Sequence, residues 1–268
     1  RDLLSLHTQL HLRLVHAAIG TYPCHSEKSF LPVNRLLMIF ADSGQDDSYI
    51  HDLANGILYP MRRGNIYFVP CRYEINQHQT EDLEFVSFQF NLDLFPGFDL
   101  MSRFPGCRVF DRPDIVDEAR SLIRSHDEPF ALCRINEIIY SLCSNCLREK
   151  PELFKHDMEY RYEWQTILDY VEKECTALLT VGALAEMKKM RQDVFSRKFT
   201  KEMGISPKDF ILRTLFRKSS VLLGNHSLSV REIAETLHFS SEFYFSRFFK
   251  HQSGMSPTEY RRFYENGK

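Results

Sequence analysis

The stretch that decides the fold runs Ser246-Arg247-Phe248-Phe249, then Gly254-Met255-Ser256-Pro257-Thr258-Glu259-Tyr260. Fifty residues earlier the chain reads Ser196-Arg197-Lys198-Phe199, then Gly204-Ile205-Ser206-Pro207-Lys208-Asp209-Phe210. The serine, arginine, phenylalanine, glycine, Ser-Pro pair and closing aromatic residue all recur at this one offset. An internal repeat at fixed spacing is typical of a duplicated structural unit. Two copies of a small helical unit indicate a protein that binds a periodic partner, and DNA is the leading candidate.

Each copy has the signals of a helix, a turn and a second helix. Ser229 followed by Glu232 forms a capping box that starts the first helix of the second copy. Thr180 lies at the equivalent place in the first copy. The glycine that follows each second helix predicts a left-handed helix end, and the Ser-Pro pair caps the next helix.

The second helix of each copy is predicted to present a polar stripe. In the helix expected over about 192–202, Phe195 and Phe199 face the core, which leaves a stripe at i, i+3, i+4 and i+7. An α-helix fits the major groove of DNA, where arginine can donate two parallel hydrogen bonds to guanine. A solvated helix face is the alternative for one copy alone. The predicted DNA-binding residues are Asp193, Ser196, Arg197 and Thr200, and in the second copy Ser241, Glu242, Phe243, Ser246, Arg247 and Lys250.

The two stripes differ at one position. Phe243 stands where the first copy has Asp193, so an acidic group is exchanged for a ring able to contact a thymine methyl group. We therefore expect the two copies to read different base sequences. If they meet successive major grooves, their separation is about 34 Å, one turn of the duplex.

Charge is distributed unevenly along the chain. The formal net charge is −2, but residues 176–268 carry 16 Lys and Arg against 9 Asp and Glu, an excess of +7 that leaves −9 on the rest. Clustered cations are typical of phosphate-backbone binding, because each neutralised phosphate releases counterions. A solvated basic face is the alternative explanation.

Length and composition indicate a two-domain globular protein. The chain has 268 residues, 43% of them hydrophobic and 26% charged. Its apolar runs are shorter than the roughly 18 residues of a membrane span, and its first residues lack the pattern of a secretory signal, so we expect a cytoplasmic protein with no membrane partner. Seven cysteines are an odd number, which disfavours a disulfide framework. Cys143 and Cys146 are predicted to be buried thiols rather than half of a zinc site.

Residues from about 10 to 92 are predicted to form a small antiparallel sandwich or barrel. Runs such as 66–69 and 83–90 are rich in β-formers and bounded by turn residues. In the second run, one face carries Phe85, Ser87 and Gln89, and the other Val86, Phe88 and Phe90. This period of two is typical of a half-buried antiparallel strand.

Helices are predicted after the strands. Pro96-Gly97 and Pro105-Gly106 mark turns, and helices follow over about 113–125 and 129–149, each opened by a proline. We divide the chain into a domain at 1–150, a linker at 151–158 and a domain at 159–268, which opens with a helix over about 159–175. The helix over 129–149 has an apolar stripe that packs either on the β-domain or against another subunit. Its candidate dimerisation residues are Ile135, Ile138, Ile139 and Leu142.

The repeated unit resembles the signature of the AraC/XylS family of bacterial transcription regulators. The resemblance covers residues from about 164 to 262 and rests on Ile233-Ala234-Glu235, Phe239-Ser240-Ser241 and the stretch from Phe248 to Arg261. It implies two helix-turn-helix units joined by a long helix over about 208–223. It also implies a cupin-like N-terminal barrel that senses a small molecule. The chain departs from the family in its turns, where His238 replaces the usual glycine, and Lys189 and Arg191 replace glycine and serine.

The cupin resemblance is carried by Arg63-Gly64-Asn65-Ile66-Tyr67-Phe68-Val69-Pro70. Proximity to this strand makes four residues candidates for binding the effector, although a plain surface role is the alternative for each: Arg72, Tyr73, His78 and Glu84. Metal-binding cupins need clustered histidines. His51 and His78 are too far apart in the sequence for a local pair, so we expect no metal and no cofactor.

The expected fold is α+β in two domains, an N-terminal cupin-like antiparallel β-barrel with following helices and a C-terminal all-α double helix-turn-helix domain. The expected function is a sequence-specific DNA-binding transcription regulator, not an enzyme, controlled by a small molecule such as a sugar or other metabolite. Double-stranded DNA and a second copy of the chain are expected partners, and the resemblance adds RNA polymerase. The alternatives are a cupin enzyme with an accessory DNA-binding module and a ligand-independent regulator whose barrel serves only assembly.

Overall fold

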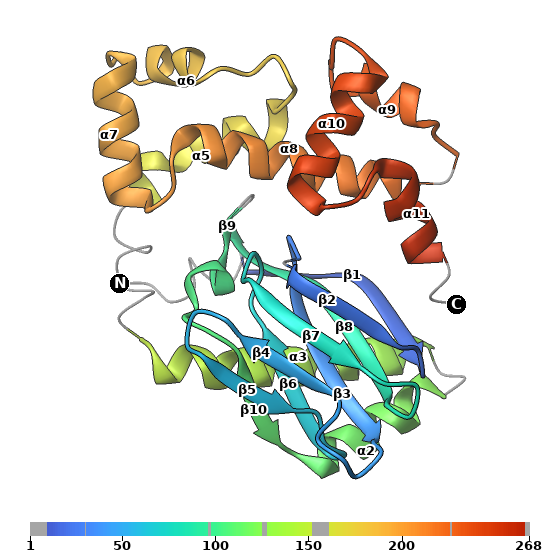
Figure 1. Ribbon diagram of the computed structural model, residues 1–268. Helices are drawn as coiled ribbons and strands as arrows, with labels where there is room; N and C mark the ends of the chain where they lie inside the picture. Colours follow the sequence, from blue (N-terminus) through green and yellow to red (C-terminus); the bar gives the residue numbers. More distant parts are fainter. Residues whose placement is uncertain are drawn as a thin grey trace. The chain divides into compact units, whose positions relative to one another are not determined.

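A computed structural model of the chain describes residues 10–29, 31–95, 98–124, 128–151, 161–225 and 227–265. The chain divides into two compact units, one containing Leu10–Leu92 and Leu100–Glu149 and the other containing the helices from residue 161 onward (Figure 1). The first unit consists of antiparallel strands followed by helices, and the second is helical. The predicted α+β fold class is confirmed.

Two sheets build the N-terminal unit (Figure 1). The six-stranded sheet has the order β1-β8-β3-β6-β10, with β9 paired to β8. Its strands are β1 (His11–Gly20), β3 (Asn34–Ala41), β6 (Asn65–Val69), β8 (Glu84–Phe95), β9 (Phe98–Asp99) and β10 (Arg108–Asp111). The four-stranded sheet has the order β2-β7-β4-β5. Its strands are β2 (Cys24–Ser29), β4 (Tyr49–Asp52), β5 (Ile57–Pro60) and β7 (Ile75–Gln79).

An apolar core lies between the two sheets. Leu37 and Ile39 of β3 face Ile50 of β4 and Ile75 of β7, and all four side chains are at most 1% exposed. Register places Leu37 opposite both Tyr67 on β6 and Ser87 on β8. The inward-facing residues of β3 are therefore the odd-numbered ones, because side chains alternate along a strand.

Strand β8 corrects the expectation of a half-buried strand. All six residues from Phe85 to Phe90 are at most 4% exposed, so both faces are covered. The face with Phe85 and Ser87 points between the sheets, and the face with Phe88 lies outside that core. Two helices account for the difference because they pack on this outer face (Figure 1). Alternation reports which residues share a face but not whether both faces are covered.

The helices that follow the strands are α2 (Pro113–Ile123) and α3 (Glu128–Glu149), preceded by the short 3-10 helix η1 (Leu100–Arg103). Helix α2 packs on β3, β6 and α3. The stripe on α3 is buried within the single chain, with exposures of 7%, 4%, 0% and 1% for Ile135, Ile138, Ile139 and Leu142. Of the two alternatives for this stripe, the structure shows packing within the chain, and a role in dimerisation stays a prediction. Cys143 and Cys146 are buried free thiols, as predicted.

The C-terminal unit contains two helix-turn-helix motifs. The first is α6 (Val181–Met187) with α7 (Gln192–Met203), and the second is α9 (Val230–Thr236) with α10 (Glu242–Ser253). Helix α5 (Arg161–Glu174) opens the unit, α8 (Pro207–Leu223) joins the motifs, and α11 (Pro257–Glu265) closes the unit. The predicted bounds of these helices agree with the observed ones to within about two residues. Figure 1 shows α8 running between the two motifs.

Aromatic rings fill the core of each motif. Trp164 of α5 is fully buried and lies edge-on to Phe195 and Phe199 of α7, with ring centroids 5.4 and 5.0 Å apart. In the second motif Phe249 contacts Phe216 of α8 at 5.0 Å and Tyr260 of α11 at 4.9 Å. Such aromatic pairs contribute beyond the area that they bury.

A backbone hydrogen bond joins the segment before the first motif to the second motif. The N–H of Ala177, in the segment between α5 and α6, donates to the carbonyl oxygen of Leu237 at the end of α9 over 2.9 Å. On α8, Lys218 donates to the carbonyl oxygen of Lys173 over 3.0 Å, and Arg217 forms an ion pair with Glu172. These contacts tie α5, α8 and the second motif into one unit.

The predicted linker at 151–158 falls almost entirely on residues that the structure does not describe. The predicted turn at Pro96-Gly97 also lies outside the described residues, so both stay predictions. In the part of the chain that the structure describes, no helix is both long enough and apolar enough to cross a membrane.

Candidate nucleic-acid interface

Helices α7 and α10 present the same face to solvent. Residues 191–200 and 241–250 have an identical order of exposed, intermediate and buried positions. Phe195, Phe199, Phe245 and Phe249 are all fully buried. The predicted core roles of these four phenylalanines are confirmed, and the residues between them form the solvent-facing stripe. The repeat in sequence is therefore a repeat in packing.

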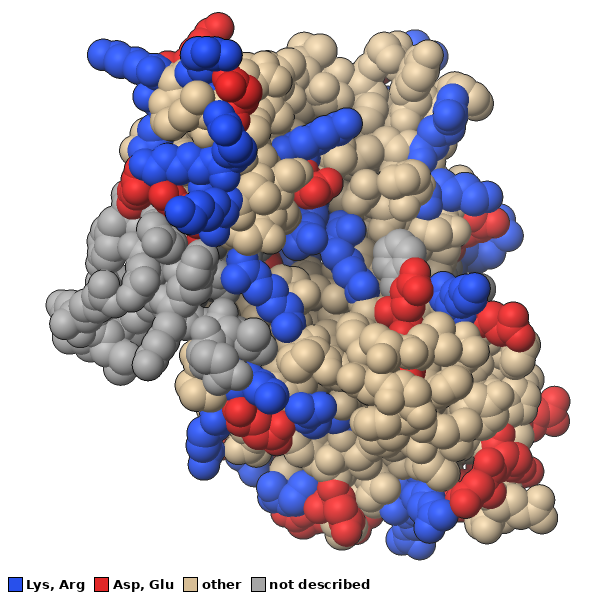
Figure 2. Space-filling view, turned by 60° about the vertical axis from the view of Figure 1, so that its left-hand side comes forward, with Lys and Arg blue, Asp and Glu red and all other residues tan. Residues whose placement is uncertain are grey.

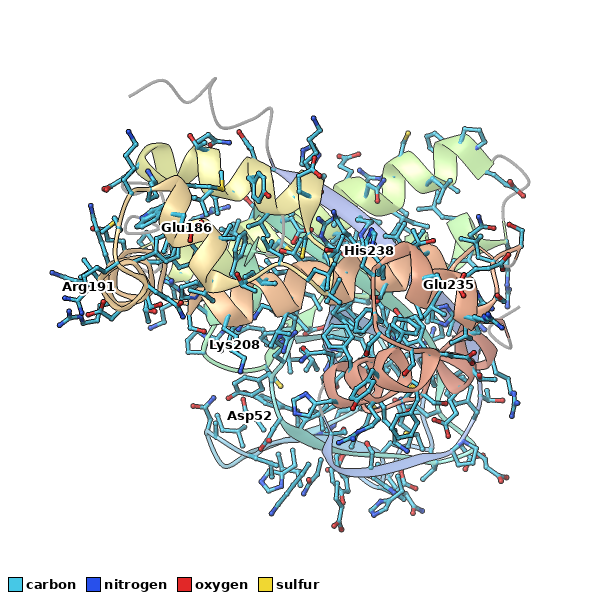
Figure 3. All side chains as sticks on the ribbon, turned by 90° about the horizontal axis from the view of Figure 1, so that it is seen from above. Asp52, Glu186, Arg191, Lys208, Glu235 and His238 are labelled. Atoms are coloured by element: carbon cyan, nitrogen blue, oxygen red, sulfur yellow. The ribbon has the colours of Figure 1, made fainter. Side chains whose placement is uncertain are left out.

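The two turns share one backbone geometry. Lys189 has φ of 52° and His238 has φ of 57°, so both lie in the left-handed region. At the first turn the backbone N–H of Lys189 donates to the carbonyl oxygen of Glu186, and that of Met190 donates to the carbonyl oxygen of Ala185. At the second turn the N–H of His238 donates to the carbonyl oxygen of Glu235, and that of Phe239 to the carbonyl oxygen of Ala234. All four distances are from 2.9 to 3.0 Å. This pair of bonds is the Schellman motif, which satisfies carbonyl groups at a helix end. Figure 3 shows Glu186 in the first motif and Glu235 and His238 in the second.

The caps fix where the helices begin and end. Ser229 and Glu232 form the predicted capping box, and Thr180 accepts a hydrogen bond from Ala183 N–H over 3.2 Å. Gly204 and Gly254 end α7 and α10 with φ of 66° and 78°. The left-handed conformation predicted for these glycines is confirmed, and their role is architectural.

In the first motif the central arginine is held by an acid. Asp193 contacts Arg197 at 3.7 Å and Arg191 at 3.2 Å, and all three side chains are at least 55% exposed. Ser196 is partly buried, and its carbonyl oxygen accepts a hydrogen bond from the Thr200 hydroxyl over 2.7 Å. A base that forms a hydrogen bond with Arg197 would therefore compete with Asp193 for the guanidinium group.

In the second motif the central arginine lies over an aromatic ring. The guanidinium carbon of Arg247 is 5.7 Å from the ring centroid of Phe243, which is itself 65% exposed. A cation stacked on a ring keeps its in-plane N–H groups directed outward. Ser241 caps α10 through the N–H of Tyr244, Glu242 is exposed at the first turn, and Lys250 is exposed further along the helix.

Sequence reasoning missed two exposed residues at this surface. Arg191 precedes α7 at the place equivalent to Ser241, and its side chain is 83% exposed; Figure 3 shows it at the edge of the first motif. The offset of 50 between the copies was the signal that could have identified it. Tyr244, next to Phe243, is 58% exposed. Figure 2 shows Lys and Arg side chains gathered on one part of the C-terminal unit.

The four predicted effector-binding residues lie in different places of the N-terminal unit. Tyr73 is part of a hydrogen-bond network around the buried Asp52, whose carboxylate accepts hydrogen bonds from Tyr73 OH over 2.7 Å, Cys107 N–H over 3.0 Å and Asn55. Gly106 packs against this network with φ of 128°, and a Cβ atom there would lie 2.4 Å from Asn55 Nδ2. The network is structural.

The same network shifts the pKa values of its members. Burial alone would raise the pKa of Asp52, but the hydrogen bonds from Asn55, Cys107 and Tyr73 outweigh it and hold that pKa below its ordinary value. Burial and the hydrogen bond to Asp52 raise the pKa of Tyr73. Burial and the neighbouring Asp52 charge raise the pKa of Cys107 to about 12. The network therefore consists of one carboxylate and neutral donors.

The other three candidates are also apart. His78 is on β7, where its ring Nδ1 lies 3.3 Å from that of His25, and it shares the outward face of the sheet with Tyr49. Glu84 forms an ion pair with Arg120 of α2 at 2.7 Å. Arg72 lies in a turn with φ of 59°. The structure does not bring the four together, and their binding role stays a prediction. Among the residues described, no three His, Cys, Asp or Glu side chains are grouped to hold a metal ion.

A different residue, Arg35, points between the two sheets. It has the same parity on β3 as Leu37 and Ile39, and its guanidinium donates to Gln77 Oε1 on β7 of the opposite sheet. Sequence reasoning missed it because the pairing of β3 was not known.

Comparison with known proteins identifies the C-terminal unit. A family model described as a helix-turn-helix domain matches residues 184–262. The probable transcriptional regulator LumQ of Photobacterium leiognathi is 29% identical over 111 residues, which are 41% of this chain and 45% of LumQ. The Msm operon regulatory protein of Streptococcus mutans is 27% identical over 144 residues, 50% of this chain and 51% of that protein. The chain thus spans about half the length of the curated relatives it matches.

The fold of the whole chain is similar to that of ToxT from Vibrio cholerae. The structure of wild-type ToxT bound to an unsaturated fatty acid matches with a TM-score of 0.58 and 13% identity over 95% of each chain. An apo variant of ToxT matches with a TM-score of 0.60 and 12% identity over 96% of this chain and 98% of that one. At this identity the likeness concerns the fold. The family match shows that residues 184–262 form a helix-turn-helix domain, in the region where the sequence resembles the AraC/XylS family.

Proposed function

We propose that this protein is a sequence-specific DNA-binding transcription regulator whose β-domain responds to a small molecule. The observation that carries the proposal is the pair of solvent-facing stripes on α7 and α10, each with an arginine at its centre and a fully buried opposite face. Exposed arginine on a helix that fits the major groove is suited to guanine recognition.

Further observations support DNA as the partner. Residues 176–268 contain 16 Lys and Arg but 9 Asp and Glu. The resulting positive charge favours binding to phosphate. Two curated relatives that match this region are named as a probable transcriptional regulator and as an operon regulatory protein. The backbone bond from Ala177 to Leu237 and the packing of α8 on both motifs hold the two stripes in a fixed relation, as reading of adjacent grooves requires.

Control by a small molecule is the second part of the proposal. ToxT, which shares the fold, has been seen with an unsaturated fatty acid bound. The two-sheet domain of this chain encloses a core with polar residues at one side, among them Arg35, Gln77 and Ser87. We further propose a second copy of the chain and RNA polymerase as partners of the bound regulator.

Selection of bound sequences from random duplex DNA tests the first part. The purified full chain should enrich duplexes with two different half-sites spaced by about one helical turn, roughly 10 base pairs. The double variant Arg197→Ala/Arg247→Ala is the matched control, because both side chains are exposed and their loss should leave the fold intact. Enrichment by the variant equal to that by the wild type, or no enrichment by either, would contradict the proposal. Metal analysis addresses the cupin-enzyme alternative, which predicts stoichiometric iron, zinc or manganese.

A further inference from the structure

Arg35 is a partly buried cation between the two sheets of the N-terminal unit. Its Nε atom is covered by protein and has no hydrogen-bond partner among the described residues, and the same is true of the Ser87 hydroxyl. Ser87 is on β8 opposite Leu37, on the face that points between the sheets with Arg35. Two polar groups that have lost water and gained no protein partner thus lie on neighbouring strands.

Among the described residues no carboxylate forms an ion pair with Arg35, and its polar neighbours include the thiols of Cys24 and Cys107 and the phenol of Tyr22. Burial lowers the pKa of the guanidinium. An arginine stays protonated in proteins even so. A charge withdrawn from water is costly unless it is paired and hydrogen-bonded. Among the described residues the Arg35 guanidinium has the neutral acceptor Gln77 but no paired carboxylate, and its Nε atom has no acceptor.

The neighbouring side chains are polar on one side and apolar on the other. Gln77, Gln79, Ser87 and Gln89 face this region and are each at most 4% exposed. On the other side the core continues with Leu37, Ile39, Tyr67 and Phe85. Arg35 itself keeps some uncovered surface despite this position. A polar head beside an apolar body would match this division.

We infer that the space between the two sheets binds a small organic anion whose carboxylate or phosphate group pairs with Arg35 and accepts a hydrogen bond from Ser87. The guanidinium supplies the charge and a directed N–H donor, a combination that favours planar and multidentate acceptors. This inference rests on the proposed effector response and names the chemical class of the effector. It favours an anion over a neutral sugar.

Ligand-induced stabilisation of the full chain tests the inference. The probes are sodium hexanoate, hexyl phosphate, hexanamide and glucose, added at equal ionic strength. We expect a saturable rise in melting temperature with at least one of the two anions and none with the two neutral probes, because a ligand stabilises only the state that it binds. A wild-type protein that neither anion stabilises overturns the inference.

Variants of Arg35 separate a binding role from a structural one. Arg35→Gln should weaken binding of the anion by at least about tenfold, while the ligand-free variant melts at the same temperature as the wild type or higher. A structural arginine would give the opposite result for the ligand-free protein. Arg62→Gln is the matched control, because Arg62 pairs with Asp46 at the surface, and it should bind the anion normally. Equal anion binding by Arg35→Gln contradicts the assignment.

Two further measurements keep the test decisive. If Arg35→Gln does not fold, Arg35→Lys keeps the charge and should retain weakened binding, and Ser87→Ala should weaken binding without loss of the fold. DNA affinity is measured in parallel on a selected duplex. Intact DNA binding without anion binding overturns this site alone, whereas anion binding without DNA binding supports the site and contradicts the proposed regulator.

Discussion

Lys189 and His238 occupy the same left-handed backbone conformation at equivalent places in the two turns, with φ of 52° and 57°. Their backbone N–H groups donate hydrogen bonds to the carbonyl oxygens of Glu186 and Glu235, over 2.9 and 3.0 Å respectively. Neither residue is glycine, which takes this conformation without the steric cost of a Cβ atom. The chain therefore keeps two strained residues in the turns that set the directions of α7 and α10.

Glycine at either turn is expected to stabilise the protein. Lys189→Gly and His238→Gly should each raise the free energy of unfolding by about 0.5–1 kcal/mol, since relief of the left-handed strain exceeds the added entropy of the unfolded chain. Urea unfolding followed by circular dichroism measures this. Glu186→Gly, an exposed helical position in the same turn, is the control and should lower it by about 1 kcal/mol. Destabilisation by both turn variants would show that their side chains contribute more than the strain costs.

The two arginines of the interface should contribute unequally to DNA affinity. Arg197 forms an ion pair with Asp193, whereas Arg247 lies over the Phe243 ring with its N–H groups directed outward. Arg247→Ala is expected to weaken binding of a selected duplex by about 1–3 kcal/mol, and Arg197→Ala by less. Titration at fixed salt measures both, because affinity depends steeply on ionic strength. A larger loss for Arg197→Ala is the contrary result.

The exchange of Asp193 for Phe243 should set the difference between half-sites. In the variant Asp193→Phe, the base preference of the first half-site should shift towards thymine, because an apolar ring contacts the thymine methyl group and the acid no longer competes for Arg197. Sequence selection compares the variant with the wild type. Asp193→Asn is its control, since it removes the charge without adding a ring. An unchanged first half-site in both variants would place Asp193 away from the bases.

Acid should destabilise the N-terminal unit through Asp52. Its pKa is held below the ordinary value in the folded protein. The unfolded carboxylate, with a pKa of about 3.9, therefore binds protons first as the pH falls. The stabilisation that the Asp52 carboxylate provides is complete above the unfolded pKa. It is lost as the pH falls from the unfolded pKa through the lower pKa of the folded protein. Calorimetry from pH 7 to pH 3 should show Asp52→Asn less stable than the wild type at neutral pH, with the gap narrowing below about pH 4. A gap independent of pH would assign the effect to shape rather than charge.

The sequence was sufficient for the C-terminal unit because its signals are local. The caps at Ser229 and Thr180, the helix-ending glycines and the buried phenylalanines four residues apart depend on neighbours within one or two turns, and each is found where it was predicted. Duplication strengthened these signals, since the same pattern at one offset excludes coincidence. The polar stripes of α7 and α10 followed from helical geometry alone.

Only the tertiary structure decided which faces of the β-domain and of α3 are buried. The α3 stripe and the outer face of β8 were ambiguous because periodicity says which residues share a face and not what covers it. Proximity along the chain selected Tyr73 and His78, yet strand pairing directs one to a structural carboxylate and the other to the outer face. Arg35 gained its place between the sheets from the pairing of β3 with β6 and β8, strands distant in sequence. Long-range pairing, which no local pattern encodes, determined the surroundings of this cation.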